Sequence, residues 1–183
     1  KLEIIIKEKT TSLIYDNSKN YFLMDDSGNL IKFLSKIEED EFIIRKITAS
    51  STVDAEKIVT TTQKNHVPNY RRVKNKFGKY PILYDTRNKD AKLKDKNLIP
   101  NNLIEAILTI EKTLISIGVG EILYYKLENI NAGITIVSNN SYKIYFQPQN
   151  NISQQLTNLK KVLENNKPIE YIDLRNGGRV FWK

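Results

Sequence analysis

Three short patterns contain residue types that could support catalysis or ligand binding. His66 is the only histidine, and no Cys or carboxylate stands near it at metal-ligand spacing. A lone histidine of this kind is typically a loop residue and forms neither a metal site nor a Ser-His-Asp triad. Asp25-Asp26 could be a carboxylate pair or begin a calcium loop, but Asp-Ser-Gly-Asn favours a β-turn. Gly118-Val119-Gly120 follows a helix-like stretch, whereas a dinucleotide motif follows a strand. We therefore predict no catalytic residue, no metal and no cofactor.

A second pattern interleaves cationic and aromatic side chains in residues 69–80. This segment lies within residues 57–100, which hold twelve Lys and Arg against three Asp, a net charge of +9. The flanking parts 1–56 and 101–183 carry −3 and +2. Such a segment could bind nucleic acid, the least favoured of the alternatives, or anionic lipid headgroups or wall polymers, or be a solvated basic loop. The candidate contacts are Arg71, Arg72, Lys74, Lys76 and Lys79.

The strongest signal is the end of the sequence, residues 171–183. Two alternating runs flank Asn176-Gly177, which predicts a β-hairpin. The last run is apolar and aromatic, and a terminal strand of this kind tends to lie at a sheet edge, where unpaired N–H and C=O groups can accept another chain. The sequence therefore indicates a binding partner rather than a substrate.

Four side chains of this hairpin have two interpretations each. Asp173 and Arg175 lie on the same side of a strand and form either an ion pair or a contact with a partner. Phe181 and Trp182 alternate, so one of them should face outward. Terminal aromatics either plug a core or serve as exposed binding hot spots, and the sequence leaves both open.

Composition narrows the class of protein. Cysteine is absent, which excludes disulfides, Fe–S clusters and thiol catalysis in these 183 residues. No run approaches the roughly 18 apolar residues of a membrane span, and no signal peptide is visible. Because the sequence starts at Lys1 without Met, we expect a fragment from which a preceding membrane segment could be missing.

The first half is predicted to begin with a small meander. Its strands are residues 2–6, which 12–15 extend, then 21–24 and 30–33, with another strand at 42–47. Residues 53–63 are weakly helical in pattern. Residues 65–97 are polar, basic and punctuated by proline, which predicts a long loop or extended crossing segment.

The second half has clear periodicity. A helix capped by Asn101 or Asn102 ends at Gly118, and a second helix is capped by Ser153. The strand-like runs are 122–127, 133–137, 142–146 and 169–174, followed by the final hairpin. The order α-β-β-β-α-β-β predicts an α+β fold, with helices on one face of an antiparallel or mixed β-sheet.

Three segments together resemble the FtsQ/DivIB family of bacterial cell-division proteins. Tyr171-Ile172-Asp173-Leu174-Arg175, followed by a Gly-containing turn and a strand with Val180 and Trp182, is similar to the family's C-terminal end. Residues 2–9, 13–15 and 21–28 look like the second half of its POTRA domain. Tyr80-Pro81-Ile82-Leu83 is similar to the entry of its β domain.

The resemblance implies a domain layout and a function. Residues 1–34 would be the C-terminal part of a POTRA-like domain and 80–183 the β domain. Residues 35–79 match nothing in the family and would be an insertion or linker, basic in its second half. The family consists of non-enzymatic, single-pass proteins of the cell membrane with their bulk on the extracytoplasmic side.

The family scaffolds the divisome by binding an FtsB/DivIC–FtsL pair. By similarity, that partner adds a strand to the terminal edge of the β domain, and no small-molecule substrate is implied. The implied contacts are Gly177, Gly178, Arg179, Val180, Phe181 and Trp182. The competing hypotheses are a basic module that binds nucleic acid or an anionic envelope polymer through 69–80, and a hydrolase with an unrecognised site.

Overall fold

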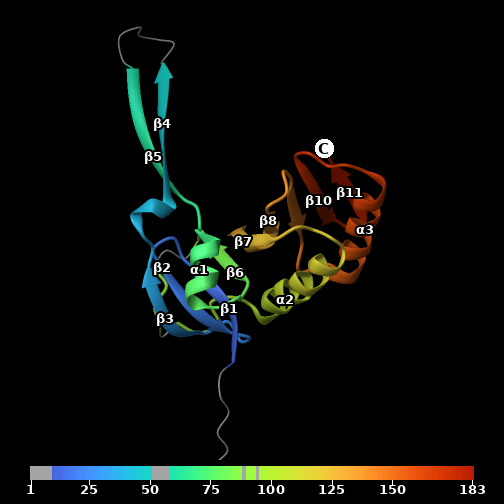
Figure 1. Cartoon of the computed structure of the whole chain (residues 1–183), viewed down its shortest axis with the longest axis horizontal. Coiled ribbons are helices and arrows are strands. Elements are labelled where there is room, and N and C mark those ends of the chain that lie inside the picture. Colours follow the sequence, from blue (N-terminus) through green and yellow to red (C-terminus); the bar gives the residue numbers. More distant parts are fainter. Residues whose placement is uncertain (1–9, 51–57, 88–89, 94) are drawn as a thin grey trace, which may run out of the picture.

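The computed structural model describes residues 10–50, 58–87, 90–93 and 95–183 (Figure 1). These residues form a mixed nine-stranded sheet in the order β11-β10-β9-β8-β7-β6-β1-β2-β3 and a separate two-stranded sheet, β4-β5. The predicted α+β class is confirmed. The strands of the main sheet are β1 (Thr11–Asp16), β2 (Asn20–Asp25), β3 (Leu30–Lys36), β6 (Ile82–Asp85), β7 (Ile122–Asn129), β8 (Gly133–Ser138), β9 (Lys143–Phe146), β10 (Tyr171–Asn176) and β11 (Arg179–Trp182).

Two consecutive units of the chain share one connectivity. In the first, β6 leads through α2 (Asn101–Ser116) to β7, which is parallel to it, and β8 returns antiparallel. In the second, β9 leads through α3 (Ile152–Asn165) to the parallel β10, and β11 returns antiparallel. The predicted order α-β-β-β-α-β-β is therefore present, but the sheet contains parallel pairs because each helix connects two neighbouring strands.

The N-terminal meander belongs to the same sheet. Strand β1 pairs parallel with β6, with Ile14 opposite Ile82, and antiparallel with β2. The ladder thus runs without interruption from the meander to the C-terminal hairpin, across the sequence ranges 1–34 and 80–183. The division into a POTRA-like part and a β domain stays a prediction, and the strand expected at 2–6 lies outside the described residues.

The main core lies between the sheet and helices α2 and α3. Helix α2 contributes a stripe of fully buried side chains that includes Ile104, Ile107 and Ile110, and α3 adds Leu159. They pack against strand residues from Leu83 to Ile172 across the sheet. The expectation that these two helices share one face is confirmed. The caps of both helices differ from the prediction. Pro100 precedes α2 without a side-chain cap, and Asn151, rather than Ser153, caps α3.

A third helix, α1 (Tyr70–Phe77), covers the opposite face of the sheet. The loop or extended segment predicted for 65–97 is wrong here. Asn69 caps the helix by accepting a hydrogen bond from the backbone N–H of Arg72, and Tyr70, Val73 and Phe77 pack on the sheet at helical spacing. With only three apolar positions among cations, the stripe is too short to stand out in the sequence.

The second sheet is a long hairpin that projects from the main body (Figure 1). Strand β4 (Phe42–Ser50) pairs with β5 (Ile58–His66) over nine consecutive residue pairs, from Phe42 opposite His66 to Ser50 opposite Ile58. The strand predicted at 42–47 is confirmed. The weak helix predicted at 53–63 is wrong for 58–63, where a β-branched run pairs with β4, and its first residues lie outside the described part.

The core predicts a contrast between two isoleucines of α2. We expect Ile107→Ala to lower the free energy of unfolding by about 2–5 kcal/mol, since its side chain is fully buried and truncation leaves a cavity. Ile115→Ala on the same helix, where 70% of the residue is exposed, should change it by less than about 0.5 kcal/mol. Urea denaturation of both variants measures this, and equal losses would contradict the described packing.

Candidate functional site

The patterns first considered for chemistry have structural roles. Asp25 Oδ1 accepts hydrogen bonds from the backbone N–H groups of Ser27 (3.0 Å) and Asn29 (2.9 Å), so this Asp holds the β2–β3 turn. Gly118 follows α2 with a positive φ of 76°, a backbone conformation that favours glycine, so this glycine serves the turn from α2 to β7. Among the described residues, no group of three or more His, Cys, Asp or Glu could hold a metal ion.

The predicted terminal strand, β11, is an edge strand of the main sheet. Lys183 donates a backbone hydrogen bond to the carbonyl of Tyr171 (3.1 Å) and accepts one from its N–H (3.4 Å). Hydrogen-bonded and non-bonded pairs alternate in an antiparallel ladder, and Trp182 is the next residue, opposite Ile172. The backbone N–H and C=O of Trp182 therefore face away from β10, toward the open edge.

Both terminal aromatic residues are accessible. Phe181 is 50% exposed and Trp182 is 46% exposed, so Trp182 does not plug the core. Val180 is half-buried and packs against the main core, and Arg179 is exposed. Gly177 and Gly178 form the turn with positive φ values of 52° and 96°. The six predicted partner contacts thus lie together on one short edge.

Asp173 and Arg175 form the local ion pair of the first interpretation. Arg175 Nη2 lies 2.6 Å from Asp173 Oδ2, and Nε donates to Oδ1 at 2.9 Å. The guanidinium also donates to the carbonyl of Ala132 (3.1 Å) and lies 4.9 Å from the ring centroid of Tyr145. Burial raises the pKa of the Asp173 carboxyl, but the hydrogen bonds from Arg175 lower that pKa by more. The pKa of Asp173 therefore lies below its usual range.

Comparisons of the chain with family models, with curated proteins and with solved structures returned no match. No helix within the described residues has the length and apolar character needed to cross a membrane.

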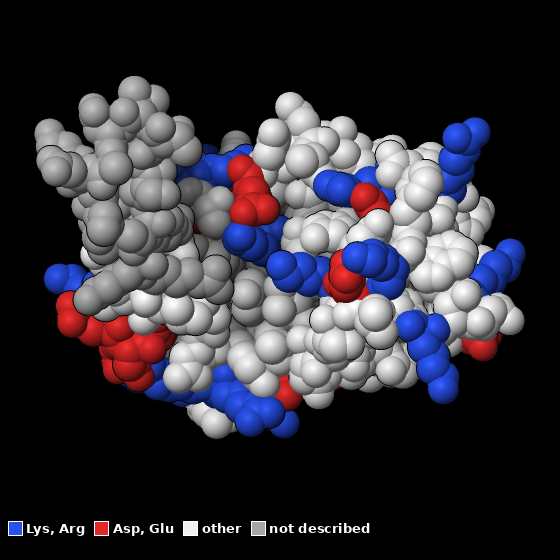
Figure 2. All heavy atoms as spheres, turned by 90° about the horizontal axis from the view of Figure 1, so that it is seen from above, with Lys and Arg blue, Asp and Glu red and all other residues white. Residues whose placement is uncertain are grey.

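The basic candidates are spread around α1 rather than gathered into one cationic surface. Arg72 pairs with three carboxylates just before β4, at 2.8 Å from Glu38, 3.0 Å from Asp40 and in direct contact with Glu41. Lys76 Nζ lies 5.2 Å from the centroid of the Phe77 ring. Figure 2 shows positive and negative side chains interspersed on the face that it presents. Of these candidates, Arg72 has its charge balanced by carboxylates within the fold.

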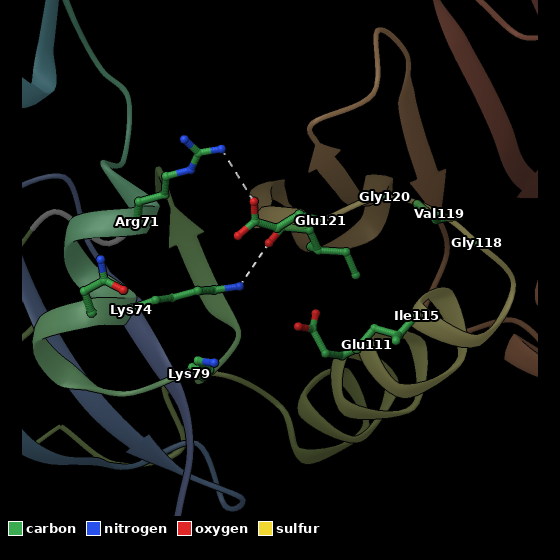
Figure 3. A pocket seen from close by; sticks show the side chains of 11 residues that line it. Arg71, Lys74, Lys79, Glu111, Ile115, Gly118, Val119, Gly120 and Glu121 are labelled. Atoms are coloured by element: carbon green, nitrogen blue, oxygen red, sulfur yellow. Dashed lines mark hydrogen bonds and ion pairs between the residues drawn. The ribbon is translucent and has the colours of Figure 1, made fainter.

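Arg71, Lys74 and Lys79 instead line a groove of about 620 Å³ between α1, α2 and the connection 118–122 (Figure 3). Lys74 Nζ donates to the carbonyl of Ile122 at 3.0 Å, which links α1 to the start of β7. Glu111, on α2, accepts a hydrogen bond from the hydroxyl of Tyr125 at 2.6 Å. This groove lies at the start of β7, beside Ile122, and β7 is four strands away from β11.

Sequence reasoning missed a buried polar network at the base of the hairpin. His66 Nε2 lies 2.6 Å from Asp16 Oδ2, and both side chains are inaccessible or nearly so. His66 Nδ1 lies 3.2 Å from the carbonyl of Glu41, whose buried carboxylate accepts from Tyr21 and Arg72. Burial raises the pKa of Asp16, although the His66 bond opposes this rise. The interpretation of His66 as a loop residue is wrong, since His66 ends β5 and is buried against Asp16. Its partner is 50 positions away, so no local sequence pattern reveals the pair.

This network predicts a strong coupling between two residues. His66→Ala leaves the Asp16 carboxylate buried without its ring partner and should cost about 3–5 kcal/mol of unfolding free energy. Asp16→Asn, which keeps the acceptor for the Ser18 N–H, should make a further His66→Ala change much less costly. Urea denaturation of the two single variants and the double variant measures the coupling; strictly additive losses would rule it out.

The lowered pKa of Asp173 predicts a pH dependence. Its ionised form contributes stability above the unfolded-state pKa of about 4, and this contribution is lost as the pH falls through the lower folded-state pKa. Asp173→Asn should therefore cost about 1 kcal/mol at pH 7 and progressively less below about pH 4. Denaturant titrations at stepped pH test this, with Asp173→Asn/Arg175→Gln expected to lose less than the sum of the single variants.

Proposed function

We propose that this chain is the extracytoplasmic part of a divisome scaffold of the FtsQ/DivIB type. It would bind an FtsB/DivIC-like and FtsL-like partner by strand addition along Gly177–Trp182, without enzymatic activity. Its place at the cell membrane would depend on a segment outside these residues. The observation that supports the proposal best is the open edge of β11, with the outward backbone groups of Trp182 and two exposed aromatic rings.

Strand addition uses the groups that this edge presents. The backbone of Trp182 would exchange hydrogen bonds with an incoming strand, which provides affinity. Exposed aromatic side chains at an interface centre are frequent hot spots, a role that suits Phe181 and Trp182. Arg179, exposed at the start of the strand, would favour an acidic residue of the partner and fix its register.

The opposite edge, β3, suits an added strand less well. Its pairing with β2 shifts register twice, between Tyr21 and Phe22 and between Leu23 and Met24. It also carries Lys32 and Lys36, and lysine on an edge strand discourages pairing with another chain. The other hypothesis, a basic module acting through 69–80, is weakened because Arg72 already contacts three carboxylates.

The proposal predicts how substitutions at Trp182 affect binding. With a synthetic peptide from an FtsB- or DivIC-like protein of the same genome, Trp182→Ala should weaken binding at least tenfold by removing the indole. Trp182→Pro removes the indole and also the outward N–H, and should weaken binding at least tenfold more. Isothermal titration calorimetry measures both.

Phe33→Ala supplies the matched control, since Phe33 is a 45% exposed aromatic residue on the other edge strand. The affinity of the Phe33→Ala variant for the peptide should equal that of the unchanged chain. If Trp182→Pro binds as well as the unchanged chain while remaining folded by circular dichroism, β11 is not the binding edge.

A further inference from the structure

The groove between α1 and α2 has walls of opposite charge. Figure 3 shows Arg71, Lys74 and Lys79 on the α1 side, with Glu111 on the facing helix and Glu121 between them. Ile115, with 70% of its surface exposed, stands on the α2 side. A volume of about 620 Å³ falls within the range of small-molecule sites, which combine an apolar lining with a few convergent polar groups.

The cationic wall holds charge that the fold does not neutralise. Among the described residues, no carboxylate lies within ion-pair distance of Lys74 or Lys79. The ammonium of Lys74 donates to a backbone carbonyl, and Arg71 reaches Glu121 only at 3.8 Å with both side chains largely exposed. An anionic group entering from solvent would therefore meet available donors on this wall.

Two carboxylates of the groove are held in place, Glu111 on the α2 side and Glu121 between the two sides. Glu111 is positioned by the hydroxyl of Tyr125, which is fully buried beneath it. Glu121 is held by the Tyr70 hydroxyl at 3.2 Å and by its own backbone carbonyl, which accepts from the Asn139 N–H at 2.9 Å. A ligand with a single negative charge would be attracted to one wall and repelled by the other.

We propose that this groove binds a short zwitterionic peptide. Its carboxylate would lie against Lys74 and Lys79, its amine against Glu111 and Glu121, and an apolar side chain between them would cover Ile115. This inference is independent of the role proposed for β11, because it rests on different residues at a different place on the sheet.

The test uses the tripeptide alanyl-leucyl-alanine and the whole chain labelled with ¹⁵N. The tripeptide with free ends should shift the backbone amides of Val119–Ile122 in a saturable manner. The same tripeptide with acetyl and amide ends, which lacks both charges, should bind at least tenfold more weakly, and so should inorganic phosphate. Absence of shifts with the free tripeptide, or equal affinity for the capped one or for phosphate, would overturn the proposal.

Four charge-neutralising variants locate the site. Lys79→Gln and Glu111→Gln should each weaken the tripeptide at least fivefold, and glutamine at 111 can still accept from the Tyr125 hydroxyl. Lys76→Gln on α1 and Glu105→Gln on α2 are the matched controls, since both residues are exposed and lie outside the groove. Controls within twofold of the unchanged chain support the site, whereas equal weakening in all four variants would show only a loss of general charge attraction.

Discussion

Strand β6 is buried along its whole length, and the rest of the fold follows from this constraint. It lies between β1 and β7 and is parallel to both, and an interior parallel strand must be covered on both faces of the sheet. Leu83 faces the core beneath α2, while Ile82 faces the cluster beneath α1. The short basic segment forms a helix because this second face needs an apolar cover, which Val73 and its neighbours supply.

The same parallel strands bring acidic residues into the interior. Asp16 and Asp85 end β1 and β6, and neither side chain is accessible to solvent. A buried carboxylate costs several kcal/mol unless it is paired. Asp85 accepts from the Tyr15 hydroxyl at 3.0 Å and pairs with Arg87 at 2.9 Å, and Asp16 pairs with His66. Because His66 ends β5, its contact with Asp16 also fixes the base of the projecting hairpin to the sheet.

The parts of the fold that could be predicted are those whose signals are local. The helices beginning at Asn101 and Ile152 have several turns of apolar repeats, and Asn176-Gly177 specifies a hairpin without reference to distant residues. Helix α1 has only eight residues, and His66 owes its role to Asp16, far away in sequence. The edge position of β11 was predictable from composition, but the exposure of both Phe181 and Trp182 was not. Trp182 stands opposite the fully buried Ile172, yet on the edge strand 46% of its surface stays exposed.

The distribution of charge along the sequence also differs from its distribution in the folded molecule. Summed over the sequence, residues 57–100 look like a site for an anionic polymer, yet Arg72 meets the acidic residues 38–41 of the negatively charged first part. Folding therefore cancels charge between segments that a count along the chain keeps apart. Arg71, Lys74 and Lys79 line one groove together with Glu111 and Glu121. A ligand there would respond to the local arrangement of both signs, and the net charge of the segment says little about what it binds.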